Sequence, residues 1–326
     1  MYKRQLLKWV HAIPKEQFKA DIGAIKKIKR ALQQNLPVAI APAGQITVHG
    51  DSLMIDPSIA KLIKMCKVDV YAIQIHGNYF AYPKWRKHRR KSPIHTEFVK
   101  VLDKNELDTL SDEEVYKKTC DAIDICDRNE VRRFHYHLKS EGLMEGMEKI
   151  LYQCPKCMTK YQMITHGSLL ECRNCLNTIK MNSNGLLEGV GKDYVLLQNE
   201  TDWYKWEQQN MKNEIKDGQF YLEGEFKLYH NFYKPYQLDE VGVGKVVLTI
   251  NAFYYEGTIE GKQIKKEFKL DRLTQLPFEV NSHFDIPDDD GCFEFKPLKG
   301  QRTSIIIEFV QAIEVMYQMR KSEQND

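Results

Sequence analysis

The chain has 326 residues, of which 42% are hydrophobic and 29% are charged. This balance is typical of a folded globular protein of about two domains, and it excludes collagen, coiled-coil rods and disordered tails. No apolar run approaches the ~18–20 residues that a transmembrane helix needs. The first residues also lack the apolar core of a signal peptide.

The charges are distributed unevenly along the chain. Residues 1–100 contain 19 lysines and arginines against 6 acidic residues, which gives +13. Residues 101–326 contain 29 against 39, which gives −10. The basic front favours an anionic partner: phosphate groups, an anionic membrane surface or nucleic acid.

The front of the chain alternates predicted helices and strands. Helix-start signals occur at Asp21, at Asp56-Pro57 and at Ser111, which has Glu114 three residues later. The expected elements are helices over 21–32, 57–66 and from 111 onward, buried strands over 36–41 and 68–75, and a further strand over 94–102. This alternation indicates an α/β layer fold.

The rear of the chain is predicted to be rich in β-structure. Residues 129–150 have a helical pattern, Thr201-Asp202 caps a helix over 203–216, and residues 303–319 return to helical spacing. Short strands are expected over 219–230, 243–256, 261–271 and 292–297. Antiparallel strands closed by one terminal helix indicate a small barrel or sandwich, such as the pleckstrin-homology type.

Four of the eight cysteines form two C-x-x-C pairs separated by fourteen residues: Cys154, Cys157, Cys172 and Cys175. Each pair can fold as a knuckle, and Gly167 lies where a hairpin between the knuckles should turn. Two knuckles make a closed site of four thiolates, which suits a structural zinc ion and leaves no open position for a catalytic water. An iron–sulfur cluster fits the same spacing. The other cysteines are scattered singly, which indicates a reducing cytoplasm rather than a disulfide framework.

The order of segments at the front resembles the glycerophospholipid acyltransferase family, whose best-known members acylate 1-acylglycerol 3-phosphate. The resemblance lies in Ala12–Lys15, Val38–Ala41, Pro42–Gly44, Val68–Gly77 and Tyr82–Trp85. The rear resembles an extension of some bacterial members, in which a four-cysteine ribbon precedes a segment like Asp202–Glu207 and a β-rich region ending in a helix. The resemblance implies an α/β acyltransferase-type domain with its N-terminal part missing, a zinc ribbon and a β-rich C-terminal module.

The resemblance also implies where substrate binds. Lys15 matches the basic residue of one family block, and Ala41–Gly44 stands where the family usually has Phe-Pro-Glu-Gly. Substrate contacts are therefore expected from Lys15, Pro42, Ala43, Gly44 and Gln45. Ala43 in place of glutamate removes a charge and a hydrogen-bond acceptor, and Gln45 removes a phosphate partner. These departures predict a different polar acceptor or a weak activity.

The family's catalytic block, a histidine, four residues and an aspartate, is missing upstream of Lys15. In the family mechanism this histidine is the general base for an acceptor hydroxyl, which attacks the thioester of acyl-CoA or acyl-carrier protein. The one such spacing in the chain, His283 to Asp288, follows all the other blocks and is interpreted as a chance match. We therefore expect no catalytic residue in this chain and no activity from it as written.

The first five residues predict that the reading frame is truncated. Met1–Gln5 resembles the translated end of a transposon adapter used in sequencing libraries. The natural sequence is then expected to resume near Leu6, with the catalytic block and any membrane-inserting segment upstream.

The predicted function is fatty acyl transfer from an acyl thioester to a lysophospholipid-type acceptor in phospholipid biosynthesis. The protein is expected to be cytoplasmic and peripheral to the inner face of the cell membrane. The basic run Lys84–Lys91 is interpreted either as a contact with anionic head groups, with Tyr82 and Trp85 at the interface, or as a solvated loop.

Two alternatives come from other classes of protein. One is a nucleic-acid-binding zinc-ribbon protein, which the acidic balance of residues 101–326 disfavours. The other is a non-enzymatic membrane-recruitment module built on a degenerate acyltransferase domain.

The expected domain organisation has four parts. They are the rear of an acyltransferase domain over 1–128, a helical linker over 129–150, a zinc ribbon over 151–182 and a β-rich domain with a C-terminal helix over 183–326. Outside the expected sites, His76 is interpreted as a structural histidine with satisfied hydrogen bonds. Trp203 and Trp206 are interpreted as core packing.

Overall fold

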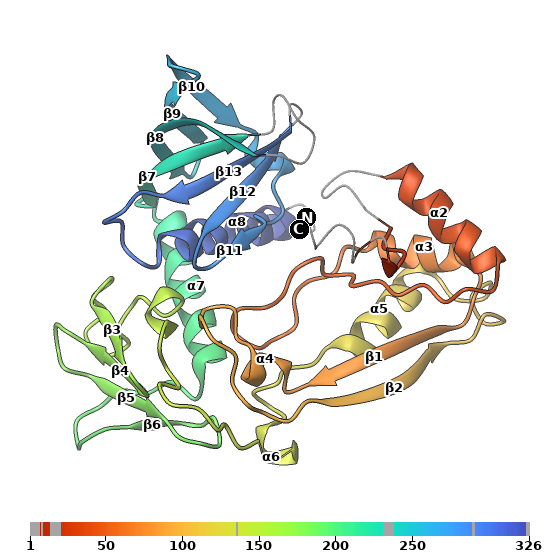
Figure 1. Ribbon diagram of the computed structural model, residues 1–326, viewed down its shortest axis with the longest axis horizontal. Coiled ribbons are helices and arrows are strands. Elements are labelled where there is room, and N and C mark those ends of the chain that lie inside the picture. The colour runs from red at the N-terminus through yellow and green to blue at the C-terminus, as the bar shows by residue number, and fades with distance from the viewer. Residues whose placement is uncertain are drawn as a thin grey trace. The chain divides into compact units, whose positions relative to one another are not determined.

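The computed structural model describes residues 7, 9–13, 21–134, 136–230, 238–288 and 291–323. It is a mixed α/β structure with antiparallel sheets of four and seven strands (Figure 1). The chain divides into two compact units whose segments alternate along the sequence. The first unit comprises residues 1–46, 52–75 and 96–125, and the second comprises residues 47–51, 76–95 and 126–326.

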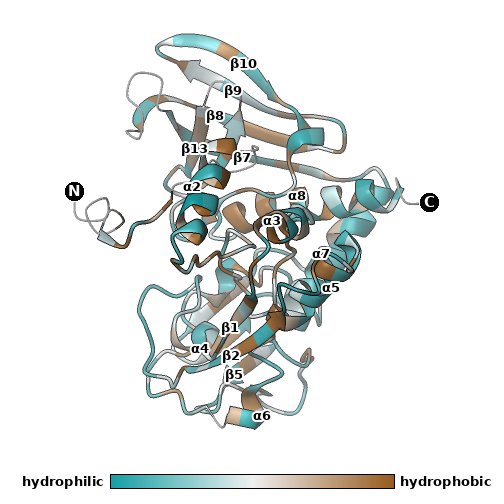
Figure 2. Ribbon diagram, turned by 90° about the vertical axis from the view of Figure 1, so that its right-hand side faces the viewer, coloured by the Kyte–Doolittle hydropathy of each residue, from teal (hydrophilic) through white to brown (hydrophobic). Residues whose placement is uncertain are grey.

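Among its described elements, the first unit contains helices and most of a two-stranded sheet. These elements are α2 (Ile22–Gln33), α3 (Ser58–Cys66), α5 (Asp112–Ile123), β1 (Val70–His76) and β2 (His95–Leu102). Their buried core is small and consists of Ala60, Leu102, Leu107 and Val115. Lysines give α2 its mainly hydrophilic colour in Figure 2.

Two helix starts in this unit confirm the sequence prediction. The Asp21 carboxylate accepts a hydrogen bond from the Ala24 N–H at 2.8 Å. The Ser111 hydroxyl accepts from the Glu114 N–H, while the Glu114 carboxylate accepts from the Ser111 N–H at 2.7 Å. These contacts satisfy backbone donors that the first helical turn leaves without an intrahelical partner.

The strand predicted over residues 36–41 is wrong. The segment has no strand pairing, and Leu36 and Ile40 are about half exposed, at 53% and 48%. Pro37 has no N–H to donate to a neighbouring strand, so the short apolar run cannot complete a ladder.

The strand β1 is confirmed, but it is not buried on both faces. Tyr71, Ile73 and Ile75 are exposed, whereas Ala72 and His76 are buried. This alternation is typical of a strand with one packed face rather than of the interior of a layered sheet.

The second unit begins with short helices. They are α4 (Asn78–Ala81), α6 (Val131–Phe134) and the 3₁₀ turn η1 (Met147–Lys149). Within the described part of the predicted helical linker, 129–150, α6 and η1 are the helical segments. Tyr136 and Met144, which lie between them, are buried in the core of this unit. The apolar spacing of the linker therefore reflects buried side chains on an irregular backbone.

The seven-stranded sheet is two antiparallel meanders joined side by side. Its strands are β7 (Tyr221–His230), β8 (Asp239–Thr249), β9 (Phe253–Ile259), β10 (Lys262–Phe268), β11 (Phe278–Glu279), β12 (His283–Asp288) and β13 (Gly291–Pro297). Their order is β10-β9-β8-β7-β13-β12-β11, so the first and last strands of the set pair with each other. The single strand predicted over 243–256 is two strands, because the chain turns back after Thr249, whose N–H donates to the Ala252 carbonyl.

A terminal helix covers one face of this sheet, as predicted. This helix, α8 (Ile305–Glu323), inserts Phe309 among Phe226, Phe253 and Phe284, with ring centroids 5.1–6.0 Å apart. A further helix, α7 (Glu200–Lys216), packs against α8. It begins earlier than predicted, because the Asn199 side chain, not Thr201, accepts from the Asp202 N–H and caps it.

Candidate metal centre

The cysteines lie at two tight turns beside a small sheet. Its strands are β3 (Met163–His166), β4 (Leu169–Cys172), β5 (Thr178–Met181) and β6 (Leu187–Gly189), paired in that order. The hairpin between β3 and β4 turns at Gly167, which has a positive φ of 60°, as the sequence predicted.

The two C-x-x-C turns have the same backbone geometry. The N–H of Met158 donates to the Cys154 carbonyl at 2.9 Å, and the N–H of Leu176 donates to the Cys172 carbonyl at 2.8 Å. Met158 and Leu176 both adopt a left-handed conformation, with φ of 62° and 57°. Both turns therefore have the same strained backbone conformation at equivalent positions, and this conformation directs the four sulfur atoms toward one point.

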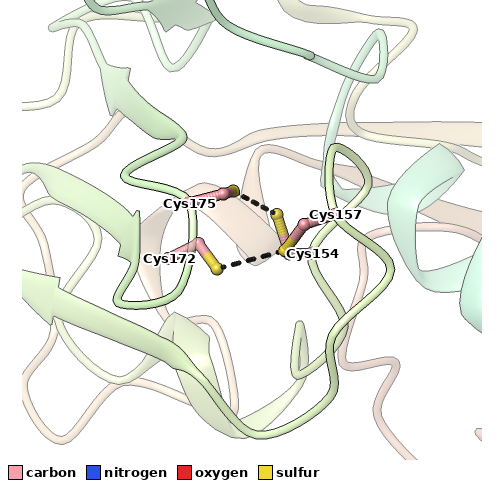
Figure 3. A group of neighbouring side chains, drawn as sticks. All are labelled: Cys154, Cys157, Cys172 and Cys175. Atoms are coloured by element: carbon pink, nitrogen blue, oxygen red, sulfur yellow. Dashed lines mark hydrogen bonds between the residues drawn. The ribbon is translucent and has the colours of Figure 1, made fainter.

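The four sulfur atoms meet at the distances of a metal site (Figure 3). Cys154 Sγ lies 3.6 Å from Cys175 Sγ, and Cys157 Sγ lies 3.7 Å from Cys172 Sγ. Zinc–sulfur bonds of about 2.3 Å in tetrahedral geometry place the sulfurs about 3.8 Å apart, whereas a disulfide bond needs about 2.05 Å. The side chains present therefore fit a single metal ion held by four thiolates.

The protonation of the thiols differs within the group. Burial raises the pKa of Cys154 to about 12 and also raises that of Cys172. Burial acts in the same direction on Cys157, but hydrogen bonds from Asn174 and Thr159 outweigh it and lower its pKa to about 5. A metal ion that binds all four sulfurs must therefore displace protons at neutral pH.

The helix α7 holds the first cysteine turn through the residue before Cys154. The Gln153 N–H donates to the Glu207 carboxyl at 2.7 Å, and the Trp203 indole N–H donates to the Gln153 carbonyl at 2.9 Å. The Asn210 amide also donates to the Gln153 side-chain oxygen at 3.0 Å. Trp203 is fully buried, which confirms its predicted packing role.

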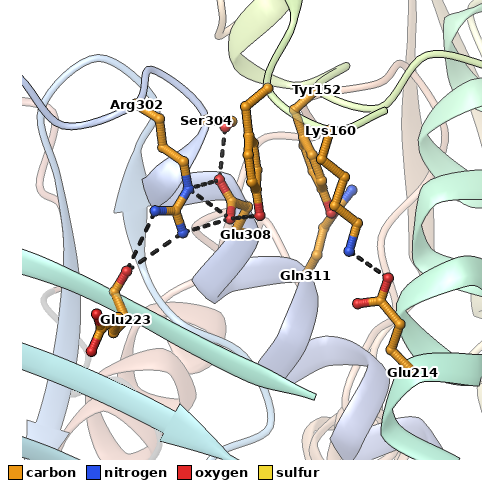
Figure 4. Close-up of polar contacts among 9 residues, drawn as sticks. Tyr152, Lys160, Glu214, Glu223, Arg302, Ser304, Glu308 and Gln311 are labelled. Atoms are coloured by element: carbon orange, nitrogen blue, oxygen red, sulfur yellow. Dashed lines mark hydrogen bonds and ion pairs between the residues drawn. The ribbon is translucent and has the colours of Figure 1, made fainter. Parts of the chain in front are cut away.

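The segment on either side of the first cysteine turn also contacts α8 (Figure 4). The hydroxyl of Tyr152 donates to Gln311 at 2.9 Å, and that of Tyr161 donates to Glu308 at 3.1 Å. Glu308 also accepts from Arg302 and from the Ser304 hydroxyl. The candidate metal centre is thus fixed to both long helices of the second unit.

The expected substrate residues do not form a comparable group. Lys15 lies outside the described residues. Pro42, Ala43 and Gly44 lie in a turn closed by a hydrogen bond from the Gly44 N–H to the Ala41 carbonyl, with a positive φ at Gly44, and Gln45 follows the turn. The turn predicted from Pro42-Ala43-Gly44 is confirmed, whereas its role toward substrate stays a prediction.

Two histidines behave differently from one another. His283 lies on β12, and its ring lies beside the Ser282 hydroxyl and the Glu294 carboxylate. His76 is buried against Phe134, with ring centroids 4.9 Å apart, but neither ring nitrogen has a hydrogen-bond partner among the described residues. The prediction that the hydrogen bonds of His76 are satisfied is wrong.

Part of the basic run Lys84–Lys91 points inward. Trp85 is fully buried, so its predicted place at a membrane interface is wrong. Arg86 donates to the carbonyls of Glu141 and Gly142, and Arg90 donates to that of Leu143. These guanidinium groups stabilise the backbone of 141–143, which the sequence pattern could not reveal.

The exposed part of the same run is smaller than the sequence suggests. The side chains of Lys87, His88, Arg89 and Lys91 remain exposed. The Arg89 guanidinium lies over the ring of Tyr82, 4.9 Å from its centroid. The surface charge of the run therefore comes from Lys87, Arg89 and Lys91.

Sequence reasoning missed a second group of potential metal ligands. His283, Asp285 and Glu294 place one ligand atom each within 4.8 Å of one another. The sequence analysis predicts no strand over 283–288, so the spacing of His283 and Asp285 carries no signal by itself. Glu294 joins them only through the pairing of β12 with β13.

Comparisons with protein-family models, with curated proteins and with solved structures find no match to this chain. Within the described ranges, no helix combines the length and the apolar character that a membrane crossing requires.

We predict that Glu207→Gln reduces the pH dependence of stability. Burial raises the pKa of Glu207 well above its usual value, so the folded chain keeps a proton that the unfolded chain releases above about pH 4.5. The free energy of unfolding should then fall as pH rises from about 4.5 toward the raised pKa, by at most about 1.4 kcal/mol per pH unit. Glutamine keeps the acceptor for Gln153 and cannot ionise.

Urea unfolding between about pH 5 and 8 measures this effect. Relative to the unsubstituted chain, Glu207→Gln should gain stability as pH rises. The matched control is Glu214→Gln on the same helix, which removes a carboxylate from a partly exposed ion pair with Lys160 and should not gain stability in this way. Parallel curves for Glu207→Gln and the unsubstituted chain would contradict the prediction.

Proposed function

We propose that Cys154, Cys157, Cys172 and Cys175 hold a structural zinc ion. The single observation that carries this proposal is the pair of sulfur separations, 3.6 and 3.7 Å, at two equivalent turns. Four thiolates leave no open coordination position, so the ion would act by tying the two turns together rather than by activating water.

Zinc content tests this assignment directly. The purified protein should contain about one zinc ion per chain and no iron. Cys157→Ser and Cys172→Ser should each lose the zinc ion and lower the thermal unfolding temperature. The control is Cys120→Ser on α5, which should keep the zinc content and the unfolding temperature of the unsubstituted protein. Zinc affinity should rise with pH, because the raised pKa values of Cys154 and Cys172 make protons compete with the metal. Iron and inorganic sulfide in the protein would instead identify a cluster.

We further propose that the chain is the rear part of a glycerophospholipid acyltransferase with a zinc-ribbon and β-rich extension. The order of segments from Val38–Ala41 to Tyr82–Trp85 carries this proposal. The full enzyme would transfer an acyl group from acyl-CoA or acyl-carrier protein to a lysophospholipid-type acceptor. The two joined meanders and the helix α8 support a β-rich domain of pleckstrin-homology type.

The general base of this reaction would lie outside the present chain. The one H-x-x-x-x-D spacing, which begins at His283, would not supply it, because it follows all the other family segments. In the structure the His283 ring lies beside the Ser282 hydroxyl and the Glu294 carboxylate.

We predict that residues 1–326 alone do not acylate lysophosphatidate from either thioester donor, because they lack the general base. The same chain extended by its natural upstream sequence should be active, and the activity should disappear when the upstream block histidine is replaced by alanine. The control His283→Ala should leave the activity of the extended protein unchanged. Turnover by residues 1–326 that is lost on His283→Ala would contradict the proposal.

The same proposal places the protein at the cytoplasmic face of the cell membrane. Lys87, Arg89 and Lys91 would contact anionic head groups, because they are the exposed basic side chains of the run. Attraction to an anionic surface amounts to about 1 kcal/mol per basic residue.

Replacing these three residues by glutamine should therefore weaken binding to phosphatidylglycerol vesicles roughly a hundredfold. The matched control removes three exposed lysines elsewhere in the second unit, Lys262, Lys269 and Lys299, and should have a much smaller effect. Tighter, salt-dependent binding to DNA or RNA than to vesicles would instead favour a nucleic-acid-binding protein.

A further inference from the structure

An imidazole and two carboxyl groups lie together on β12 and β13. They are on the outer face of the seven-stranded sheet, which is the face opposite the phenylalanine core. These strands pair antiparallel, and Asp285 lies directly opposite Glu294. His283 lies two residues before Asp285 and therefore on the same face. The alternate residues Phe284, Phe293 and Phe295 point into the core. The backbone register thus fixes the three polar side chains beside one another.

Two acidic side chains directly opposite one another destabilise a sheet unless a cation or a proton compensates them. Glu294 is only 7% exposed, so water screens the pair poorly. Lys296 Nζ lies 2.8 Å from Glu294 Oε1 and supplies one positive charge. Asp285 Oδ1 is buried and has no hydrogen-bond partner among the described residues, so this carboxyl group must hold either a proton or a cation in the folded chain.

The histidine ring is oriented as a ligand. His283 Nδ1 lies 2.9 Å from the Ser282 hydroxyl oxygen, and Nε2 lies 3.5 Å from Glu294 Oε2. A hydrogen bond that Nδ1–H donates to Ser282 leaves the lone pair of Nε2 directed at the carboxylates. A separation of 3.5 Å is long for a hydrogen bond. It is close to the ~3.3–3.4 Å between nitrogen and oxygen ligands on a tetrahedral zinc ion with bonds of about 2.0–2.1 Å.

We propose that His283 Nε2, Asp285 and Glu294 Oε2 bind a divalent transition cation on the outer face of the sheet. One imidazole and two carboxylates suit zinc or manganese. Three protein ligands leave at least one coordination position open, in contrast to the four-cysteine centre. The bound cation would add positive charge beside the two carboxyl groups, of which Lys296 compensates only one. This site is independent of the four cysteines.

Metal titration of the folded protein tests the site. The protein is first loaded with one equivalent of zinc and freed of excess metal, which saturates the cysteines. Calorimetric titration with Zn²⁺ and, separately, Mn²⁺ should then show one further ion per chain. His283→Ala and Asp285→Asn should each weaken this second binding by at least about tenfold, since losing a group that merely orients a ligand already costs about 10–100-fold in affinity.

Two further variants separate coordination from general charge effects. Glu279→Gln is the matched control, because Glu279 pairs with His283 across β11 and β12 but is not among the three ligands, and it should bind like the unsubstituted protein. Lys296→Gln should tighten binding, because it removes the ammonium that competes for Glu294. Thermal unfolding without added metal checks that each variant is folded. The proposal is overturned if no second ion binds, or if His283→Ala and Asp285→Asn bind it as tightly as the unsubstituted protein.

Discussion

The arrangement of the second unit depends on the hydrogen bonds that fix the backbone at Gln153. Its N–H and its carbonyl are both bound by side chains of α7, from Glu207 and Trp203. Buried backbone groups of this kind are costly to leave unpaired, and Gln153 adjoins the first cysteine. The position of the sulfur atoms is therefore coupled to a helix that lies about fifty residues further along the chain, and through α8 to the seven-stranded sheet.

Local patterns explain why part of this structure could be predicted from the sequence. The cysteine turns, the hairpin at Gly167 and the capping box at Ser111 each depend on residues within a few positions of one another. Each also has a residue type whose chemistry leaves few alternatives: a thiolate, a glycine with positive φ, a hydroxyl with a glutamate three residues later. The terminal helix α8 was predictable for the same reason, because its apolar spacing extends over several turns.

Long-range contacts explain what could not be predicted. The sequence around Glu207 does not distinguish it from an exposed helical glutamate, because its partner Gln153 is far away in the chain. Arg86 and Arg90 are likewise indistinguishable from surface charges in the sequence, because the carbonyls that they bind belong to residues 141–143. His283 and Glu294 meet only through the register of β12 and β13. The strand prediction for residues 36–41 was wrong because it relied on local composition alone. The composition favours a strand, but Pro37 has no N–H to donate to a partner strand.

The binding of Gln153 by α7 also limits how this part of the chain can be inherited. A ribbon moved into another protein without α7 would lose the acceptor and the donor for Gln153, while α7 left behind would expose the buried side chains of Trp203 and Glu207 to water. Genetic exchange between proteins must therefore keep the cysteine ribbon together with α7 and, through Tyr152 and Gln311, with α8. Recombination breakpoints between the ribbon and α8 should be selected against.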